Sequence, residues 1–196
     1  NGYVNETAVN AGTYTAQAIS LDNPNYTLAG GTNVSEEYTI EKLDITDRTD
    51  LEILMGESLT YNGTIQIQKI NSVKIGNLNV VYEISDNSAT DAGAYTLTIT
   101  GAENFTGAVK ADFTVLQAEN APNMPDSVMN TAIRNRKKVS DISLKKYTDW
   151  VWRIEDADKI LPTEENESIT VTACYQGADK ANYKNTLQQI LLIMKK

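Results

Sequence analysis

An Asn-aromatic pair recurs along the chain at a nearly constant interval, and this repetition limits the folds that the chain can adopt. The pair stands at Asn25-Tyr26, Asn104-Phe105 and Asn182-Tyr183, so that successive copies are 79 and 78 residues apart. Repetition at a fixed period is typical of chains built from copies of one supersecondary unit. The spacing therefore predicts about two and a half copies of one module.

Each copy of the pair follows a segment with the pattern of a half-buried β-strand. In the second copy, Tyr95, Leu97 and Ile99 alternate with threonines at 96, 98 and 100, which is the period of a strand with one wet face. Asx-Ala-Gly turns precede this strand in the first two copies, at 10–12 and 91–93, and glycine there supplies a positive φ. The third copy lacks the tripeptide, so its turn must be built differently.

Further strands must come from the front half of each module, because a lone hairpin is marginally stable in water. The patterns at 51–54, 59–64, 65–70 and 80–84 predict strands, with an Asn-Gly turn at Asn62-Gly63. In the last module, 139–144 predicts one short helical turn, and 150–152 predicts a strand. The fold class expected is mainly β, with tandem small β modules, either Ig-like sandwiches or β-grasp-like, and few or no long helices.

Domain boundaries follow from the last strand of each copy. Residues 1–45 are predicted to be the C-terminal half of a module, 46–118 a complete module, and 119–196 a complete module with a short helical turn. The segment 120–125 holds a close pair of prolines and predicts a stiff linker. A half module leaves sheet edges open, so we expect its edge to be covered by the neighbouring module or by a second chain.

The composition excludes several classes of site. The chain has no His and one Cys, which excludes a His-based triad, an imidazole metal site, an intrachain disulfide and a Cys-based zinc cluster. The formal charge of −9 disfavours nucleic acid and anionic membrane surfaces as partners. We expect no catalytic residues, no cofactor and no metal, and hence no enzyme.

Two charged stretches are interpreted as solvated loops. The basic run is Arg134 to Lys138, within an otherwise acidic chain. The acidic stretch 155–167 could offer oxygen ligands to a hard cation, but it lacks the glycine and the spacing of a calcium loop.

Ligand binding is the main alternative to a packing role for the aromatic residues. Trp150 and Trp152 lie on one face of their predicted strand, with Tyr147 nearby, and could form a ligand-stacking platform for a sugar. The packing alternative, which we favour, places this face in the core, because tryptophan mostly buries. The paired aromatics Tyr26, Phe105 and Tyr183 are expected to plug the core, and Cys174 to be a small packed residue.

The chain shows no segment of the length of a membrane span and opens on no signal-peptide pattern, so an exported protein would be present here as a mature piece. Its acidic, Thr- and Asn-rich, nearly cysteine-free composition favours export from a bacterium, to the cell surface or the medium. The Asn-X-Ser/Thr sites at 5, 25, 33, 62, 104 and 166 follow from the same composition and imply no glycan.

The turn chemistry resembles that of known surface proteins. The segment 91–101 with 104–107 resembles tandem repeats of bacterial cell-surface proteins, and 10–15 with 23–27 is similar to MBG/YDG-type repeats of large surface adhesins. The segments 139–142, 150–152 and 175–183 are similar to a repeat of gut Firmicutes surface proteins. Departures are Ala94, where Thr is usual, and 145–148, where a Pro-Gly turn is common. The resemblance implies an extracellular, wall-attached stalk or adhesin segment with Ig-like or β-grasp-like modules and no catalytic residues.

The function predicted is therefore a non-catalytic extracellular repeat segment that acts as a stalk or spacer, or as an adhesive display module. Neighbouring repeat modules and a host or glycan ligand are the expected partners, without nucleic acid or insertion into a membrane. The alternative is a carbohydrate-binding accessory region of a secreted enzyme. A protein-binding adhesin tip would instead need a large exposed apolar patch.

Overall fold

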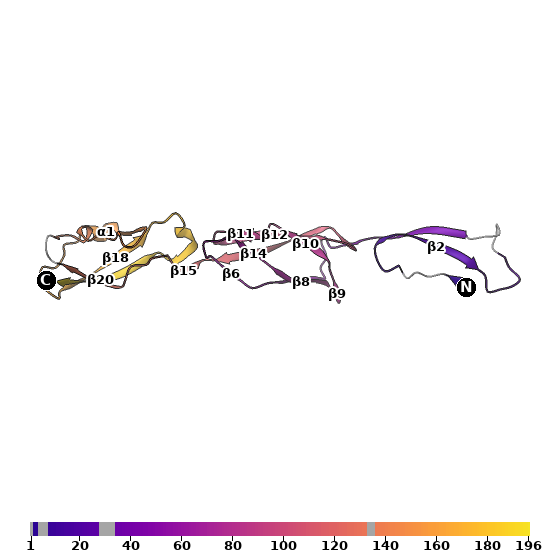
Figure 1. Cartoon of the computed structure of the whole chain (residues 1–196), viewed down its shortest axis with the longest axis horizontal. Helices are drawn as coiled ribbons and strands as arrows, with labels where there is room; N and C mark the ends of the chain where they lie inside the picture. Colours follow the sequence, from indigo (N-terminus) through magenta and orange to yellow (C-terminus); the bar gives the residue numbers. More distant parts are fainter. Residues whose placement is uncertain (1, 4–7, 28–33, 133–135) are drawn as a thin grey trace. The chain divides into compact units, whose positions relative to one another are not determined.

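The computed structural model describes residues 2–3, 8–27, 34–132 and 136–196, and most of its elements are β-strands (Figure 1). Within these residues the single α-helix, α1, spans only Ile154–Ala157, and η1 (Val139–Asp141) and η2 (Lys180–Asn182) are 3-10 turns. The expected mainly β fold class is thereby confirmed. The strands are β1 (Gly2–Tyr3), β2 (Gly12–Ser20), β3 (Val34–Ile40), β4 (Leu43–Asp44), β5 (Leu51–Met55), β6 (Leu59–Thr60), β7 (Gln66–Ile67), β8 (Ile70–Ile75), β9 (Leu78–Asn79), β10 (Tyr82–Ser85), β11 (Ser88–Ala89), β12 (Gly93–Gly101), β13 (Phe105–Thr106), β14 (Ala108–Leu116), β15 (Ala118–Asn120), β16 (Val128–Ala132), β17 (Trp150–Trp152), β18 (Ser168–Tyr175), β19 (Tyr183–Asn185) and β20 (Leu187–Lys195).

The chain divides into two compact units. Unit 1 comprises Asn1–Glu57, Gln68–Asn87 and Thr96–Phe113, and unit 2 comprises Ser58–Ile67, Ser88–Tyr95 and Thr114–Lys196. These units do not coincide with the three predicted modules, whose boundaries at 45 and 118 remain a prediction.

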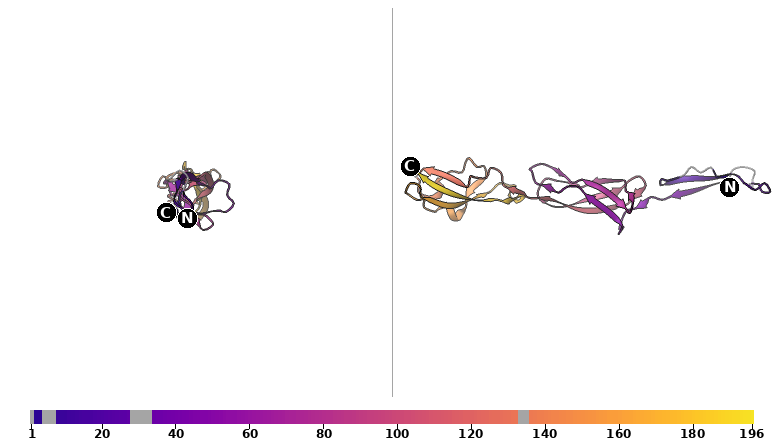
Figure 2. Two further views of the ribbon diagram at one scale, coloured as in Figure 1. Left: turned by 90° about the vertical axis from the view of Figure 1, so that its right-hand side faces the viewer. Right: turned by 90° about the horizontal axis from the view of Figure 1, so that it is seen from below.

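Unit 1 begins with a three-stranded sheet in the order β1-β2-β3. Strands β2 and β3 lie side by side and antiparallel, in register from Gly12 opposite Ile40 to Ala18 opposite Val34 (Figure 2). The rings of Tyr14 and Tyr38 stack across this pair, with centroids 5.7 Å apart. No described side chain between residues 8 and 42 is buried, so the described part of this sheet has no core of its own.

The core of unit 1 lies in its remaining strands. Strands β5, β8 and β9 form one antiparallel sheet, and β12 lies between β10 and β14 in another. The alternation predicted for β12 is confirmed, because Leu97 and Ile99 are fully buried while Thr96 and Thr100 are exposed. The buried hydrophobic side chains of unit 1 are Ile45, Val73, Ile75, Val80, Leu97, Ile99, Phe105 and Phe113.

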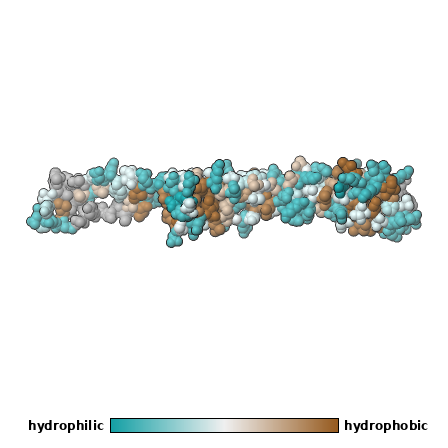
Figure 3. All heavy atoms as spheres, turned by 180° about the vertical axis from the view of Figure 1, so that it is seen from behind, coloured by the Kyte–Doolittle hydropathy of each residue, from teal (hydrophilic) through white to brown (hydrophobic). Residues whose placement is uncertain are grey.

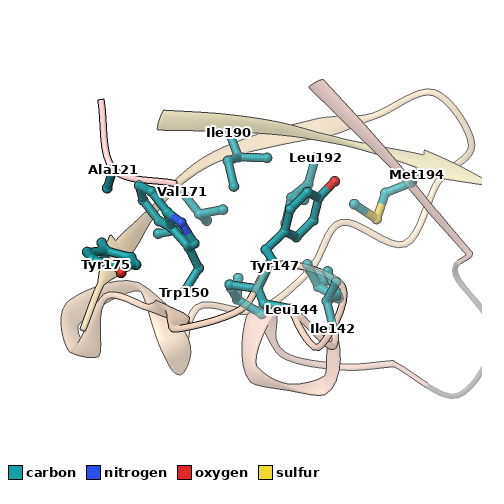
Figure 4. Close-up of a cluster of buried hydrophobic side chains, with 13 residues drawn as sticks. Ala121, Ile142, Leu144, Tyr147, Trp150, Val171, Tyr175, Ile190, Leu192 and Met194 are labelled. Carbon is teal, nitrogen blue, oxygen red and sulfur yellow. The ribbon is translucent and has the colours of Figure 1, made fainter. Parts of the chain in front are cut away.

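Unit 2 is organised around a sheet in the order β16-β20-β18-β17. Strand β16 is parallel to β20, whereas β18 is antiparallel to both β20 and β17. Buried residues of β18 and β20 meet residues of η1 and of the segment before β17 in one hydrophobic cluster (Figure 4). The short helical turn predicted near residue 140 is η1, and the predicted strand at 150–152 is β17, so both elements are confirmed.

Hydrophobic and hydrophilic residues are interspersed on the face drawn in Figure 3. Exposed hydrophobic side chains include Leu54 in unit 1 and Ile65 and Ile67 in unit 2. Among the described residues, no helix is long and apolar enough to cross a membrane.

Candidate functional site

Trp150 is a core residue of unit 2. It lies on β17 at the edge of the sheet, and only 3% of its surface is exposed. Its ring packs near Ala121, Val171 and Tyr175 (Figure 4), and its Nε1 donates a hydrogen bond of 2.9 Å to the carbonyl oxygen of Pro122. Because both the ring and its polar atom are engaged within the chain, Trp150 offers no face to a ligand.

Tyr147 and Trp152 lie close to Trp150, as the sequence suggested. Tyr147 is buried, and its hydroxyl donates to Asp126 at 2.9 Å. Trp152 is half-buried, and its Nε1 donates to the carbonyl oxygen of Ile142 at 2.7 Å. All three aromatic residues border a groove of about 400 Å³. Of the three, Trp152 alone has substantial exposed surface, and a ligand-stacking role for this cluster stays a prediction.

A second arrangement, which we call junction 1, lies in unit 1 around Asn104. The Asn104 Oδ1 accepts a hydrogen bond of 2.8 Å from the backbone N–H of Ala11, and its Nδ2 donates to the Oδ1 of Asn10 at 2.8 Å. Strand β4 runs parallel to β13 beside it, and the N–H of Leu43 donates to the carbonyl oxygen of Asn104 at 2.8 Å. Asn104 thus binds a turn some ninety residues earlier.

Junction 2 lies in unit 2 and has the same plan around Asn182. The Asn182 Oδ1 accepts from the N–H of Ala92 at 2.7 Å, and its Nδ2 donates to the Oδ1 of Asp91 at 2.8 Å. Strand β15 runs parallel to β19, and the N–H of Ala121 donates to the carbonyl oxygen of Asn185 at 3.0 Å. Asn182 is 4% exposed, so this polar group is buried with its hydrogen bonds made.

The two junctions match in detail. In each, one asparagine amide accepts from the alanine N–H of an Asx-Ala-Gly turn and donates to the Asx side chain. Each turn also accepts a hydrogen bond from the strand that follows it. The hydroxyl of Tyr14 donates to the carbonyl oxygen of Asn10, and the hydroxyl of Tyr95 donates to that of Asp91. Both motifs are visible in the sequence, but the local pattern gives the asparagine no partner. Its fixed place before the aromatic residue was the available signal.

The aromatic residues of the repeated pair have different environments. Phe105 is 5% exposed and Tyr183 is half-buried, which agrees with the predicted plugging role. Tyr26 is 67% exposed, so the prediction that it plugs a core is wrong in this structure. The described part of the sheet β1-β2-β3 has no buried side chain against which Tyr26 could pack.

Three tyrosine hydroxyls converge on Asp179 in unit 2. Tyr175 donates to Oδ1 at 2.7 Å, and Tyr183 and Tyr61 donate to Oδ2 at 2.9 and 3.3 Å. The ring of Tyr183 packs edge-on against those of Tyr61 and Tyr175, with centroids 5.4 and 5.8 Å apart. The Asp179 carboxylate therefore joins the segment at β6 to the loop before β19.

This cluster, Asp179 with its three tyrosines, perturbs the acidity of its members. The hydroxyl of Tyr175, followed by that of Tyr183, lowers the pKa of Asp179 because hydrogen bonds stabilise the ionised carboxylate. Burial and then the hydrogen bond to Asp179 raise the pKa of Tyr175 to about 12. Burial, followed by the same carboxylate, also raises the pKa of Tyr183.

The raised tyrosine pKa values predict a loss of stability in alkali. Unfolded tyrosine ionises near pH 10. The protonated hydroxyl of Tyr175 therefore stabilises the fold fully below about pH 10, and this stabilisation is lost as the pH rises toward 12. In an alkaline titration, tyrosinate absorbance reports ionisation and circular dichroism reports unfolding. We expect a group of tyrosines that ionises only at high pH, at the same pH at which the protein unfolds. The lowered pKa of Asp179 has the opposite effect on pH dependence. The ionised carboxylate stabilises the fold, and this stabilisation is lost as the pH falls below about 4. Ionisation of all tyrosines in one step near pH 10 with the fold intact would contradict this expectation.

The charged stretches have structural partners where they are described. Asp156 is 7% exposed, and it pairs with Lys159 at 2.6 Å and accepts from the N–H of Thr172 at 2.7 Å. The hydrogen bond from Lys159 lowers the pKa of Asp156, and burial partly opposes this effect. Lys138 pairs with Asp158, whereas Arg134 and Asn135 of the basic run lie outside the described residues, as do Asn5 and Asn33.

The groups relevant to metal ligation and thiol chemistry are the acidic side chains and Cys174. The described residues hold no group of three or more His, Cys, Asp or Glu side chains placed to bind a metal ion. Cys174 is buried on β18, and burial raises the pKa of its thiol. Since the thiolate is the reactive form, a raised pKa makes Cys174 less nucleophilic.

Comparison with protein-family models, with curated proteins and with solved structures found no match to this chain.

Proposed function

We propose that the chain is a non-catalytic repeat segment of an extracellular bacterial surface protein, of the MBG/YDG-like kind, that acts as a stalk or spacer. The observation that carries the proposal is the pair of matching junctions, at Asn104 and at Asn182. Each uses the same donors and acceptors, on motifs that recur at nearly the same interval. A chain of β modules joined in one fixed way is what a spacer requires.

The physical argument concerns the stiffness of the connections. A flexible linker leaves two modules free to change their orientation, and their separation then fluctuates. A buried side-chain amide with two hydrogen bonds, next to a short parallel strand pair, holds the joined segments in one geometry. Modules that contact mainly their neighbours in this way add length with each copy.

Adhesive display is the related role, in which the segment presents a ligand-binding part at a distance from the cell. The surface location rests on the acidic composition with a single cysteine, here buried, and on the resemblance of the turns. The carbohydrate-binding alternative needs exposed aromatic rings, and of Tyr147, Trp150 and Trp152 only the last has substantial exposed surface.

Small-angle scattering of the chain and of the double variant Asn104→Ala, Asn182→Ala tests the spacer proposal. Loss of each amide leaves an alanine N–H and an Asx side chain without partners, which costs about 1–3 kcal/mol per junction. We expect the released segments to reorient, so that the mean radius of gyration falls and a single conformer no longer fits the scattering.

The matched control for this experiment is Asn79→Ala, which truncates an exposed asparagine of β9 for which no side-chain hydrogen bond is found among the described residues. Its scattering should equal that of the unaltered chain. A double variant that keeps both its fold and its radius of gyration would refute the spacer proposal, because the junctions would then not set the geometry.

A further inference from the structure

Within the described residues, the first copy of the repeated Asn-aromatic pair, Asn25-Tyr26, does not make the side-chain contacts that the other two copies make. We propose that this copy is a docking surface for the Asx-Ala-Gly turn of a further module of the same kind, joined ahead of residue 1. The inference rests on the proposed function and extends it, because it assigns a partner to one particular loop.

The backbone of this first copy is shaped like those at the two junctions. The N–H of Tyr26 donates to the carbonyl oxygen of Asn23 at 3.2 Å, and the N–H of Phe105 donates to that of Ala102 at 3.0 Å. The N–H of Tyr183 likewise donates to the carbonyl oxygen of Lys180. In every copy the asparagine therefore stands just before the aromatic residue that closes a four-residue turn. The first loop is longer than the second, with Asn25 farther from Gly12 than Asn104 is from Gly93.

The side chains differ in what they contact. Asn104 and Asn182 each make two hydrogen bonds through their amides, whereas the Asn25 amide is exposed and makes none with the described part of the chain. Tyr26 is 67% exposed against 5% for Phe105. The first copy thus presents an amide whose two counterparts bind turns, and an aromatic ring whose counterparts are buried or half-buried.

The junctions define the chemistry of the occupant. It must offer one backbone N–H to the Asn25 Oδ1 and one side-chain oxygen to the Asn25 Nδ2. Both an Asn turn (Asn10) and an Asp turn (Asp91) meet this requirement. The two Asx-Ala-Gly turns of this chain are already bound by Asn104 and Asn182, so the occupant is a turn of another module.

A fusion of residues 1–81 to the start of the full chain supplies such a turn in the right place. Asn10 and Asp91 are equivalent and 81 residues apart, so residue 1 corresponds to residue 82. Strand β1 accordingly pairs with β2 as β10 pairs with β12. In the fusion, the Asn25 of the full chain therefore has the same position relative to the Asn10-Ala11 turn of the added segment that Asn104 has relative to that turn in the chain itself.

The test is Asn25→Ala in the full-chain part of the fusion, and the matched control is the same substitution in the added segment. We expect the test variant to lower the melting temperature and to speed hydrogen exchange of the Ala11 N–H of the added segment about tenfold or more. The control variant should do neither, because no module precedes the added segment and its Asn25 binds no turn.

Three outcomes would overturn the inference. The first is an equal effect of the two variants, and the second is a fusion whose added residues gain no protection from exchange. The third is a dimer of the unaltered chain in sedimentation that Asn25→Ala abolishes, since the occupant would then be a second molecule. All three leave the spacer proposal standing, because that proposal depends on Asn104 and Asn182 and is tested by scattering.

Discussion

Replacement of Trp150 by alanine is expected to lower the free energy of unfolding by about 3–5 kcal/mol, the range for truncation of a buried aromatic residue. Trp150 is 3% exposed, and its ring fills the space between Ala121, Val171 and Tyr175 (Figure 4). The variant also leaves the carbonyl oxygen of Pro122 without the indole donor. Denaturant unfolding of the full chain, followed by circular dichroism, measures the loss.

The neighbouring residues on β17 provide graded controls. Val151 points away from the core and is 47% exposed, so Val151→Ala should change the stability by about 0.5 kcal/mol or less. Trp152→Ala removes a half-buried ring and one hydrogen bond, with an expected cost of about 1–2 kcal/mol. If Trp150→Ala cost no more than Trp152→Ala, the placement of Trp150 in the core would be wrong.

The local sequence patterns predicted the strands of this region and the packing role of Trp150. Alternation of apolar and polar residues identified β12, and the two tryptophans that flank Val151 predicted β17. In both strands, successive side chains point to opposite faces. The same patterns predicted the mainly β class and the helical turn at Val139. They also placed Trp150, Trp152 and Tyr147 near one another, and they favoured the packing role for Trp150 that its burial in the structure indicates.

The junctions could not be predicted from local patterns, because their partners are far apart in the sequence. The bond from Ala11 to Asn104 joins residues that no periodicity relates, and an exposed asparagine and a bridging one have the same local sequence. For that reason Tyr26 was expected to be buried like Phe105. Whether such an aromatic ring is covered depends on which segment meets it, and the local sequence does not contain that information.

The tyrosine-aspartate cluster depends on the same kind of long-range meeting. Asp179 lies in the segment 175–183 and Tyr61 in the strand pattern at 59–64, and neither pattern relates the two residues. They are 118 residues apart and joined by a hydrogen bond. The pairing of β15 with β19 and of β6 with β14 brings Tyr183 and Tyr61 to one end of β14, and Tyr175 comes from β18.

Asp179→Ala should lower the free energy of unfolding by about 2–4 kcal/mol. The substitution removes the shared acceptor of three tyrosine hydroxyls, and a buried donor left without a partner costs about 1–3 kcal/mol. The total stays below three times that value because Asp179 is half-buried, so water can reach part of the cluster. Denaturant unfolding at neutral pH, where the carboxylate is ionised, measures the effect.

Two further variants separate the hydrogen bonds from the charge. Asp179→Asn keeps one oxygen acceptor and removes the negative charge, so it should cost less than Asp179→Ala while the pKa of Tyr175 falls from about 12 toward its ordinary value. Asp126→Ala is the matched control, because Asp126 accepts one tyrosine hydroxyl, that of Tyr147, and its loss should cost about 1 kcal/mol. Equal costs for Asp179→Ala and Asp126→Ala would mean that the three hydroxyls do not act through Asp179. An unchanged alkaline titration in Asp179→Asn would mean that burial alone raises the pKa of Tyr175.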